Sequence, residues 1–461
     1  MEEIIFHHAL KVQEETCIGC ANCMGVCPTE AIRVKHGKAR IYNNKCIDCG
    51  QCYRVCPVSA IYVEEDDFSN IFSFSCRVAL MPAVLTGQFP EEIKIETIYQ
   101  TLYDLGFTHV YEIENCVDLL SDELNRYLDD HREQHPQISA FCPAVVRLIQ
   151  VNFPSLVENL VLLKPPLDIA AEYYRKKLLN EGFREEEIGL FYVTPCAAKI
   201  AAVKSPVGET QSPFNGVINM NSVYNRLYKR IKKGKTGNHK IADHSQLTDR
   251  EMLWSLTHGE ASATGKRSLA IDGIHNVIEF LEKIESGEIK GIDFLEMRAC
   301  DESCAGGILT SGNKFLTVER LRNRAATSRK SSDAVPSARD IDNYRNYLIR
   351  HIQLDKVDPR SSVQLDQDLS VAMGKMKKQR HIMCFLPGFD CGGCGAPTCQ
   401  ALAEDVVQGD ANISHCVFLQ KIMEKNHKLS PEHALDIIEE IWGRDRLDKN
   451  CKKKGADHES I

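Results

Sequence analysis

Two twelve-residue segments near the N-terminus repeat one arrangement of four cysteines and a proline. "CIGCANCMGVCP" begins at Cys17 and "CIDCGQCYRVCP" at Cys46, so both have the spacing C-x2-C-x2-C-x3-C-P. Three thiolates at this spacing can bind one face of a [4Fe–4S] cube, and the fourth ligand comes from the other repeat. The expected ligand sets are Cys17, Cys20, Cys23 and Cys56 for one cluster, and Cys46, Cys49, Cys52 and Cys27 for the other.

A pair of zinc sites is the alternative interpretation of this repeat. Structural zinc sites usually combine two separated C-x2-C pairs and have no third cysteine at this spacing, so the repeat favours iron–sulfur clusters. Each motif is followed by a short apolar segment, "TEAIRV" or "VSAIYV", with the pattern of a strand. Over residues 1–65 the chain resembles bacterial two-cluster ferredoxins.

Length and composition limit the possible classes of protein. A chain of 461 residues is too long for one hydrophobic core, so we expect several domains. Its 20 cysteines are more typical of cluster ligands in a reducing compartment than of disulfides. A net charge of −8 without a basic stripe gives no support to nucleic-acid binding. No signal peptide and no membrane span can be recognised, so we expect a cytoplasmic location.

A second cysteine-rich unit lies near the C-terminus. Its four cysteines have the spacing C-x2-C-x4-C-x16-C, and three glycines between them let the backbone approach a cluster closely. This unit resembles the small single-cluster domain found beside ferredoxin repeats in redox complexes. Zinc remains an alternative here because the spacing is looser. The expected ligands are Cys391, Cys394, Cys399 and Cys416.

Between the two cysteine-rich ends, strand-like and helix-like segments alternate. "KIETIYQTLYDLGF" and "GIHNVIEFLEKIESGEI" have helical patterns, and "THVYEI" follows the first as a strand. "GLFYVTPC" and "GIDFLEMRAC" are apolar strands that end in a cysteine. This alternation predicts an α/β multidomain chain with parallel sheets in its centre. The expected domains are a two-[4Fe–4S] ferredoxin-like domain (1–65), a central α/β domain (66–325), a linker with helical pieces (326–375), an α-rich [4Fe–4S] domain (376–443) and a disordered tail (444–461).

Four more cysteines belong to the central region. Cys142 lies in "AFCPAVV", Cys196 in "VTPCAAK", and Cys300 and Cys304 in "LEMRACDESCAGG". Their order alone would allow four unrelated core cysteines. Cys196 and Cys300, however, each end a strand-like segment, where α/β proteins build their sites.

In order, these segments resemble the signature segments of the [FeFe]-hydrogenase catalytic domain, over roughly residues 66–325. "MPAVLTGQFP" is a further match to that family, and "TPCAAKIAAVKSPVG" and "CAGGILT" are similar to its short branches regarded as sensory or uncharacterised. The resemblance implies that the four cysteines ligate a third cubane and that Cys304 also bridges to a two-iron subsite. It further implies that Lys199 hydrogen-bonds a cyanide of that subsite and that Pro82 packs over it. A solvated lysine is the alternative interpretation of Lys199.

Several positions depart from the pattern of that family. Phe141 replaces the cysteine that passes a proton to the two-iron subsite, and a phenyl ring neither donates nor accepts a proton. The proton-relay glutamate has no clear counterpart in "CVDLLSDEL". Further replacements are Thr194 and Arg298 for methionines, Ala202 for a glutamate, and Pro165, Pro166 and Leu167 for a serine-proline-glutamine segment.

Arg298 is the most informative of these replacements. A buried arginine beside a cluster needs an anionic partner, which the cluster itself, Asp301 or Glu302 would supply. Its side chain is large enough to fill the space of a two-iron subsite. The alternative interpretation places it on the surface.

The sequence thus favours an iron–sulfur electron-transfer protein with four [4Fe–4S] clusters and a doubtful two-iron subsite. We expect a relay subunit of a larger redox complex, whose partners are a ferredoxin or other redox protein subunits. The alternative is a slow or hydrogen-sensing [FeFe]-hydrogenase with an intact subsite. A cluster needs four thiolates and a dry shell, whereas proton reduction also needs a proton path, which the sequence does not reveal.

Overall fold

The computed structural model describes residues 6–234, 237, 239, 247–331, 340–360 and 368–447. The chain divides into two compact units. Unit 1 contains Met1–Ala9, Ile47–Gly50 and Val63–Arg360, and unit 2 contains Leu10–Cys46, Gln51–Tyr62 and Ser361–Ile461. Every helix in the described ranges is too short or too polar to traverse a bilayer.

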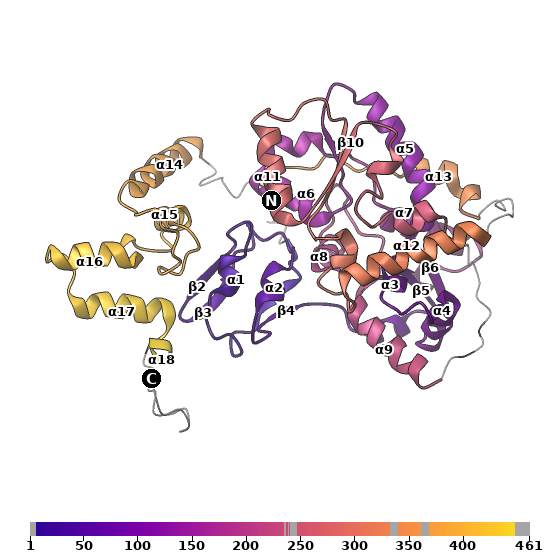
Figure 1. The fold of residues 1–461 in the computed structure, drawn as a ribbon, viewed down its shortest axis with the longest axis horizontal. Coiled ribbons are helices and arrows are strands. Elements are labelled where there is room, and N and C mark those ends of the chain that lie inside the picture. The colour runs from indigo at the N-terminus through magenta and orange to yellow at the C-terminus, as the bar shows by residue number, and fades with distance from the viewer. Residues whose placement is uncertain are drawn as a thin grey trace. The chain divides into compact units, whose positions relative to one another are not determined.

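Unit 1 is built around a parallel four-stranded sheet with the order β6-β5-β8-β9. Figure 1 labels β5 and β6 of this sheet. All seven residues of β8 are buried, as is typical of a parallel strand covered on both faces. The sequence prediction of strands at "THVYEI" and "GLFYVTPC" is confirmed. The strands are β5 (Cys76–Met81), β6 (His109–Glu112), β8 (Ile188–Thr194) and β9 (Gly216–Asn219).

A second parallel sheet of unit 1 has the order β10-β11-β7. Its strands are β7 (Gln137–Ile138), β10 (Ser268–Asp272) and β11 (Phe294–Arg298). Strands β8 and β11 each end two residues before a cysteine, Cys196 and Cys300 respectively. A cysteine therefore lies just beyond the carboxyl end of a strand in each sheet, as the sequence predicts.

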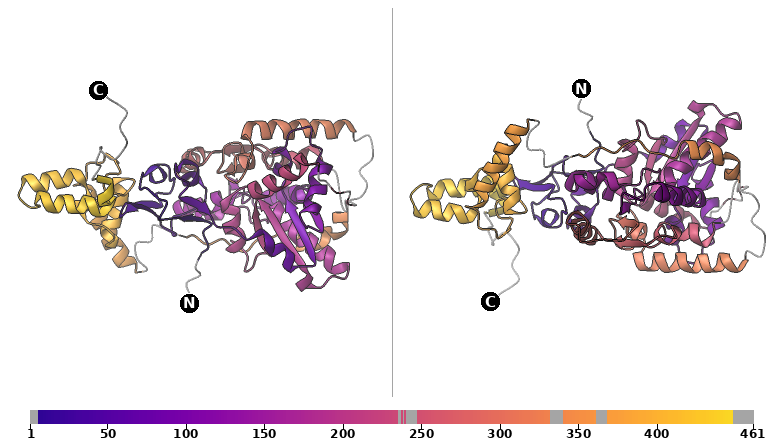
Figure 2. Two further views of the ribbon diagram at one scale, coloured as in Figure 1. Left: turned by 90° about the horizontal axis from the view of Figure 1, so that it is seen from below. Right: turned by 90° about the horizontal axis from the view of Figure 1, so that it is seen from above.

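Helices pack around these sheets and connect their strands. The predicted helices at "KIETIYQTLYDLGF" and "GIHNVIEFLEKIESGEI" are present as α4 and α11. The long helix α12 lies along the outside of the unit in both views of Figure 2. The helices of unit 1 are α3 (Val84–Gly87), α4 (Ile95–Asp104), α5 (Val117–Asp130), α6 (Pro143–Asn152), α7 (Pro166–Asn180), α8 (Ala197–Lys204), α9 (Met220–Lys232), α10 (Asp249–Leu253), α11 (Ile274–Glu285), α12 (Lys314–Ser331) and α13 (Arg345–Arg350).

Unit 2 combines the N-terminal cysteine repeats with the C-terminal cysteine-rich segment. The strands pair as β1-β4 and as the antiparallel hairpin β2-β3, and α16 and α17 lie side by side (Figures 1 and 2). Its elements are β1 (Leu10–Val12), α1 (Asn22–Gly25), β2 (Ile32–Lys35), β3 (Lys38–Ile41), α2 (Gln51–Val55), β4 (Ile61–Val63), α14 (Leu369–Met383), α15 (Cys399–Gln408), α16 (Val417–Lys425), α17 (Pro431–Trp442) and α18 (Arg444–Leu447).

The two ends of the chain join within unit 2 through backbone hydrogen bonds and a buried ion pair. The N–H of Val34 donates to the carbonyl of Gly395 at 2.8 Å, so the β2 edge pairs with the loop between two predicted cluster ligands. The Arg33 guanidinium binds the Asp405 carboxylate at 2.6 and 3.0 Å, and both side chains are buried. No pattern in the sequence predicts this junction.

The predicted domain boundaries remain predictions. Within the predicted linker, 326–375, the structure describes the end of α12, all of α13 and the start of α14, whereas 332–339 and 361–367 lie outside the described residues. Of the predicted tail, 444–461, Arg444–Leu447 is helical and 448–461 lies outside the described residues.

Candidate iron–sulfur centres

The first N-terminal ligand set lines a single pocket in unit 2. Cys17, Cys20 and Cys23 of the first repeat and Cys56 of the second all face this pocket, whose other walls are mainly apolar. The N–H of Ala39 donates to Cys17 Sγ at 3.4 Å, and the N–H of Ala60 to Cys56 Sγ at 3.2 Å. Backbone donors to thiolate sulfur are typical of iron–sulfur sites and influence the reduction potential. The four residues therefore fit one [4Fe–4S] cluster.

The second N-terminal set is described residue by residue. Cys46 and Cys52 are buried, and Cys27 Sγ accepts a hydrogen bond from the N–H of Ala31 at 3.2 Å. Cys49 belongs to unit 1, where it packs against the same hydrophobic core as Cys142 and Cys196.

The C-terminal set is positioned by two helix starts and a glycine-rich loop. Cys399 begins α15 and Cys416 directly precedes α16. The pKa of Cys394 is raised to about 11, mainly by burial and also by the nearby thiols of Cys416 and Cys391. Backbone hydrogen-bond donors partly offset this rise. Thiols that oppose one another's ionisation in this way favour a bound cation. The set therefore fits a metal centre, and Cys391 is its exposed member.

The central set converges from three separated segments of unit 1. Cys142 precedes α6 and Cys196 precedes α8, while Cys304 lies in a 3-10 turn, Ser303–Gly306. Burial raises the pKa of Cys196 to about 11, and the charges of Cys304 and Cys142 add to this effect against Lys199. Cys142 and Cys196 also pack against one hydrophobic core, and Nζ of Lys199, three residues after Cys196, lies 3.7 Å from Cys304 Sγ. The three segments therefore lie close together.

Backbone packing holds the last ligand segment in place. Cys300 follows β11, and its carbonyl accepts the N–H of Ser303 at 3.0 Å. A Cβ atom at Gly306 would stand 1.9 Å from the carbonyl oxygen of Asp301, and one at Gly307 would stand 2.3 Å from that of Pro195. These two positions therefore require glycine.

Lys199 is buried in the central set. Its side chain is 2% exposed, and Nζ lies 3.7 Å from Cys304 Sγ and 4.4 Å from the centre of the Phe141 ring. Burial disfavours its charged form, but the neighbouring anionic groups, chiefly Cys304, raise its pKa above the ordinary value. The interpretation as a solvated lysine is therefore wrong.

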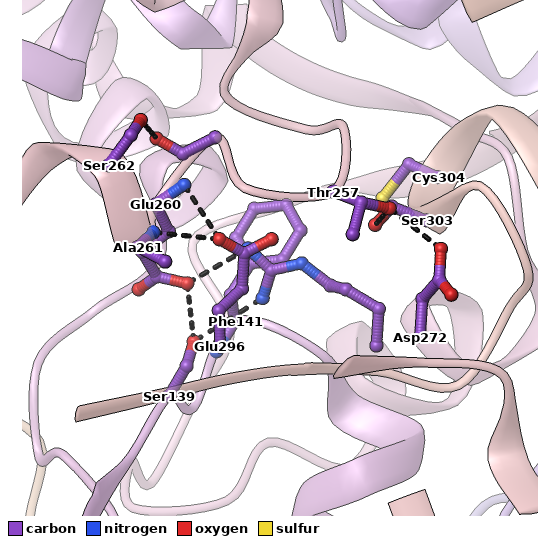
Figure 3. Close-up of polar contacts among 12 residues, drawn as sticks. Ser139, Phe141, Thr257, Glu260, Ala261, Ser262, Asp272, Glu296, Ser303 and Cys304 are labelled. Carbon is purple, nitrogen blue, oxygen red and sulfur yellow. Dashed lines mark hydrogen bonds and ion pairs between the residues drawn. The ribbon is translucent and has the colours of Figure 1, made fainter. Parts of the chain in front are cut away.

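Arg298 is likewise buried and paired. Its Nη2 lies 2.8 Å from Glu260 Oε2 and 3.8 Å from Glu296 Oε1, and its guanidinium lies 4.1 Å from the centre of the Phe141 ring. Figure 3 shows these three partners, Phe141, Glu260 and Glu296, close to one another. The surface interpretation of Arg298 is wrong. An anionic partner was expected correctly, but Asp301 forms its ion pair with Lys314 at 3.0 Å instead.

A hydrogen-bond network fixes these acids. Ser139 Oγ donates to Glu260 Oε2 at 2.6 Å and accepts the N–H of Phe141 at 3.2 Å. Glu296 accepts the backbone N–H groups of Glu260 and Ala261 at 2.9 and 2.7 Å. Sequence reasoning missed both acids. Glu296 could have been found because residues two apart on a strand share a face, which places it beside Arg298.

A cavity of about 80 Å³ adjoins Lys199 in unit 1. Asp168 also lines it, and burial, together with the charge of Glu209, raises the pKa of Asp168 to about 8. The remaining wall is largely apolar and includes three of the positions that depart from the hydrogenase pattern. These are Pro165, Leu167 and Ala202.

Two other predicted positions support the backbone around the centre. Thr194 Oγ1 accepts the N–H of Cys196 at 3.3 Å. Pro82 is buried in the turn after β5, where the next residue, Ala83, donates its N–H to Glu114 Oε2 at 2.9 Å. Burial raises the pKa of Glu114 to about 8, and the charge of Glu112 adds to the shift. Burial also raises the pKa of Glu112 to about 7.

Family models match three parts of the chain. The model "Iron only hydrogenase large subunit, C-terminal domain" matches residues 73–214 and 201–308. The model "4Fe-4S dicluster domain" matches 9–57, and a model for an Fe–S cluster segment matches 386–418. A search of curated proteins found no match.

Solved structures of [FeFe]-hydrogenases are similar to this chain at low identity. HydA(deltaEFG), solved in work on stepwise H-cluster assembly, is 15% identical, with a TM-score of 0.46 and a match over 61% of this chain and 94% of that chain. An [FeFe]-hydrogenase from work on oxygen inactivation is 14% identical, with a TM-score of 0.47 over 62% and 94%. A variant of HydA1 from Chlamydomonas reinhardtii is 16% identical, with a TM-score of 0.44 over 62% and 94%.

Replacing Arg298 tests the buried ion pairs. We expect Arg298→Met to lower the free energy of unfolding by about 3–5 kcal/mol, because two buried carboxylates lose their counter-charge. Adding Glu260→Gln and Glu296→Gln should recover more than half of that loss, as judged by denaturant unfolding under anaerobic conditions. Lys283→Met, which breaks an exposed pair with Glu279, should leave stability nearly unchanged, because solvent screens that pair. A triple variant as unstable as the single one would contradict this account.

The raised pKa of Glu114 predicts a pH dependence of stability. The folded protein holds a proton on Glu114 up to about pH 8, whereas the unfolded chain releases it near the ordinary value of 4.5. Stability should therefore fall as pH rises through this window, by about 1.4 kcal/mol per pH unit for one proton. Glu114→Gln should flatten this slope in denaturant titrations. Glu279→Gln should leave the slope unchanged because Lys283 holds the pKa of Glu279 below its ordinary value.

Proposed function

We propose the role of an iron–sulfur electron relay for this chain, which belongs to the family of the C-terminal domain of the iron-only hydrogenase large subunit. In this proposal the chain carries four [4Fe–4S] clusters, each of which stores and passes on one electron when bound. The hydrogenase-like cubane is retained and hydrogen chemistry is lost. The proposed ligands of that cubane are Cys142, Cys196, Cys300 and Cys304.

The observation that carries this proposal is the environment of Phe141. Both Lys199 and Arg298 lie within cation–π distance of its ring, at 4.4 and 4.1 Å. A phenyl ring cannot carry a proton, and Arg298 is held by two buried carboxylates. The side chains beside Cys304 therefore bind one another, and they do not fit a two-iron subsite.

Packing inside unit 1 supports electron transfer to this cubane. Ile47 is part of a hydrophobic core against which Cys49, Cys142 and Cys196 all pack. A Cβ atom at Gly50 would stand 2.6 Å from the side chain of Ile308, so this ferredoxin loop touches the segment just beyond Cys304. A ligand of the second ferredoxin cluster and ligands of the central cubane thus share one dry core.

The second candidate is a slow or hydrogen-sensing hydrogenase that keeps a two-iron subsite. The cavity beside Lys199 favours it, because it leaves space next to the cubane that Asp168 and apolar side chains line. Pro82 and Lys199 would then contact the subsite.

The relay would work as a subunit of a larger redox complex. Its proposed partners are a ferredoxin or other redox protein subunits, consistent with the match to a 4Fe-4S dicluster domain. We also propose a cytoplasmic location, because a reducing compartment keeps cysteine thiols available as cluster ligands.

Iron content and infrared spectra of protein matured with the two-iron assembly machinery separate the two candidates. The relay predicts about sixteen irons per chain and no bands of metal-bound carbonyl or cyanide. Such bands, with hydrogen turnover, would establish the second candidate instead. About eight irons would contradict both.

A matched pair of variants makes the iron count specific. Cys142→Ser should remove about four irons, because the central cubane loses a ligand. Cys116→Ser replaces a cysteine that is buried in the same unit but lies outside the proposed ligand sets, so its iron content should equal that of the wild type. Equal iron contents in the two variants would contradict ligation by Cys142.

A further inference from the structure

Helix α14 presents an unusual concentration of positive charge. The chain as a whole carries −8, but α14 contains four lysines and arginines and no aspartate or glutamate. Among these, Lys377, Lys378 and Arg380 are exposed, and none of the three forms an ion pair with another described residue. Helix α14 therefore offers unneutralised positive charge to a partner.

Large apolar side chains are also exposed in unit 2, at the end of α14 and in the segments that flank the C-terminal cysteines. Phe385, at the C-terminal end of α14, is 55% exposed, Phe389 is 63% exposed and Phe418 is 45% exposed. The rings of Phe389 and Phe418 contact each other edge to face, with 5.1 Å between their centres. Exposed aromatic side chains with a rim of charge are typical of surfaces that bind other proteins.

The aromatic pair lies at the C-terminal iron–sulfur centre. Phe389 is two residues before Cys391, and Phe418 is two residues after Cys416. Cys391 is exposed, and a Cβ atom at Gly393 would stand 3.6 Å from both Cys391 Sγ and the Val417 side chain. The exposed ligand and the start of α16 are therefore close together.

The position of α14 relative to this centre is fixed by a core. Ile382 and Leu386 are buried in a hydrophobic cluster that also contains Cys399 and Cys416, with Cys394 packed against it. The end of the positive helix and three predicted cluster ligands thus share one hydrophobic cluster of unit 2. We call α14 together with Phe385, Phe389 and Phe418 the α14 surface.

We infer that the α14 surface is the docking site of a small acidic one-electron carrier. The inference rests on the proposed relay function and names where the relay meets its partner. One electron leaves the reduced carrier, which is oxidised, and enters the C-terminal cluster at Cys391, which is reduced by one electron; no bond or proton changes. Positive charge on α14 steers an acidic carrier to this surface, and the phenyl rings exclude water from the contact.

Unit 2 also provides the next step for the electron. A Cβ atom at Gly392 would stand 3.0 Å from the Met24 side chain, and Met24 directly follows Cys23 of the first N-terminal set. The backbone bond between Val34 and Gly395 holds the two segments together. An electron that enters at Cys391 therefore has a contact path to the N-terminal clusters.

Charge and apolar exposure together are also typical of helices that lie on membranes. The α14 surface differs because its aromatic pair adjoins cluster ligands, a proximity that electron exchange requires and membrane attachment does not. The experiment therefore tests both a protein carrier and lipid vesicles.

Stopped-flow kinetics with the full-length holoprotein tests the inference. The probe is an acidic two-[4Fe–4S] ferredoxin, reduced with dithionite and separated from excess reductant. In a variant with Lys377→Glu, Lys378→Glu and Arg380→Glu, we expect the second-order rate of electron transfer at low ionic strength to fall about tenfold or more, with a weaker dependence on salt. Phe389→Ser should slow the reaction several-fold without changing its salt dependence.

The matched control reverses the same number of charges on another exposed basic segment at the end of α9. A variant with Lys229→Glu, Lys232→Glu and Lys233→Glu should react within about twofold of the wild type. Iron content and the extent of reduction by dithionite should be the same in all variants.

Three outcomes would overturn the inference. Equal slowing by the α14 and α9 variants would indicate a non-specific charge effect. Unchanged ferredoxin kinetics in the α14 variant, with loss of binding to phosphatidylglycerol–phosphatidylcholine vesicles, would make α14 a membrane surface. In both cases normal reduction by dithionite leaves the relay function standing. Clusters that dithionite does not reduce in the wild type would contradict the relay function and the docking inference together.

Discussion

The proposed central cubane constrains unit 1 more than any other feature, because three separate segments carry its four proposed thiol ligands. Parallel strands of two sheets end just before Cys196 and Cys300, and Cys142 and Cys196 each directly precede a helix. The positive end of a helix dipole favours a thiolate at such a position. Gly306 and Gly307 then allow the last segment to approach backbone carbonyls where no side chain would fit.

A buried anionic centre also determines which charges surround it. Lys199 contacts Cys304, whereas Arg298 is turned to Glu260 and Glu296, and both cations face Phe141. Because each of these charges is desolvated, replacing one residue of the group leaves its partner charge uncompensated. A single substitution in this group is therefore destabilising. The same group replaces side chains that proton transfer would need. In the relay proposal, one set of contacts accounts for both the retained cubane and the lost hydrogen chemistry.

The sequence predicted those features that depend on local patterns. Cysteine spacing identified the candidate ligands, and hydrophobic periodicity identified strands such as β8 and helices such as α11. The partner of Arg298 was mistaken because Glu260 lies 38 residues away in sequence, and nothing in local spacing places it at the end of β11. The junction of Val34 with Gly395 was missed because backbone hydrogen bonds leave no signature in residue type. The buried state of Lys199 likewise depends on packing that only the folded chain defines.

A crystal structure of the matured holoprotein with anomalous scattering from iron tests the central claim most directly. The relay account predicts four compact iron clusters and no iron on the side of Cys304 where Phe141 lies between Lys199 and Arg298. Two further irons attached through Cys304, with the Phe141 ring displaced, would contradict it.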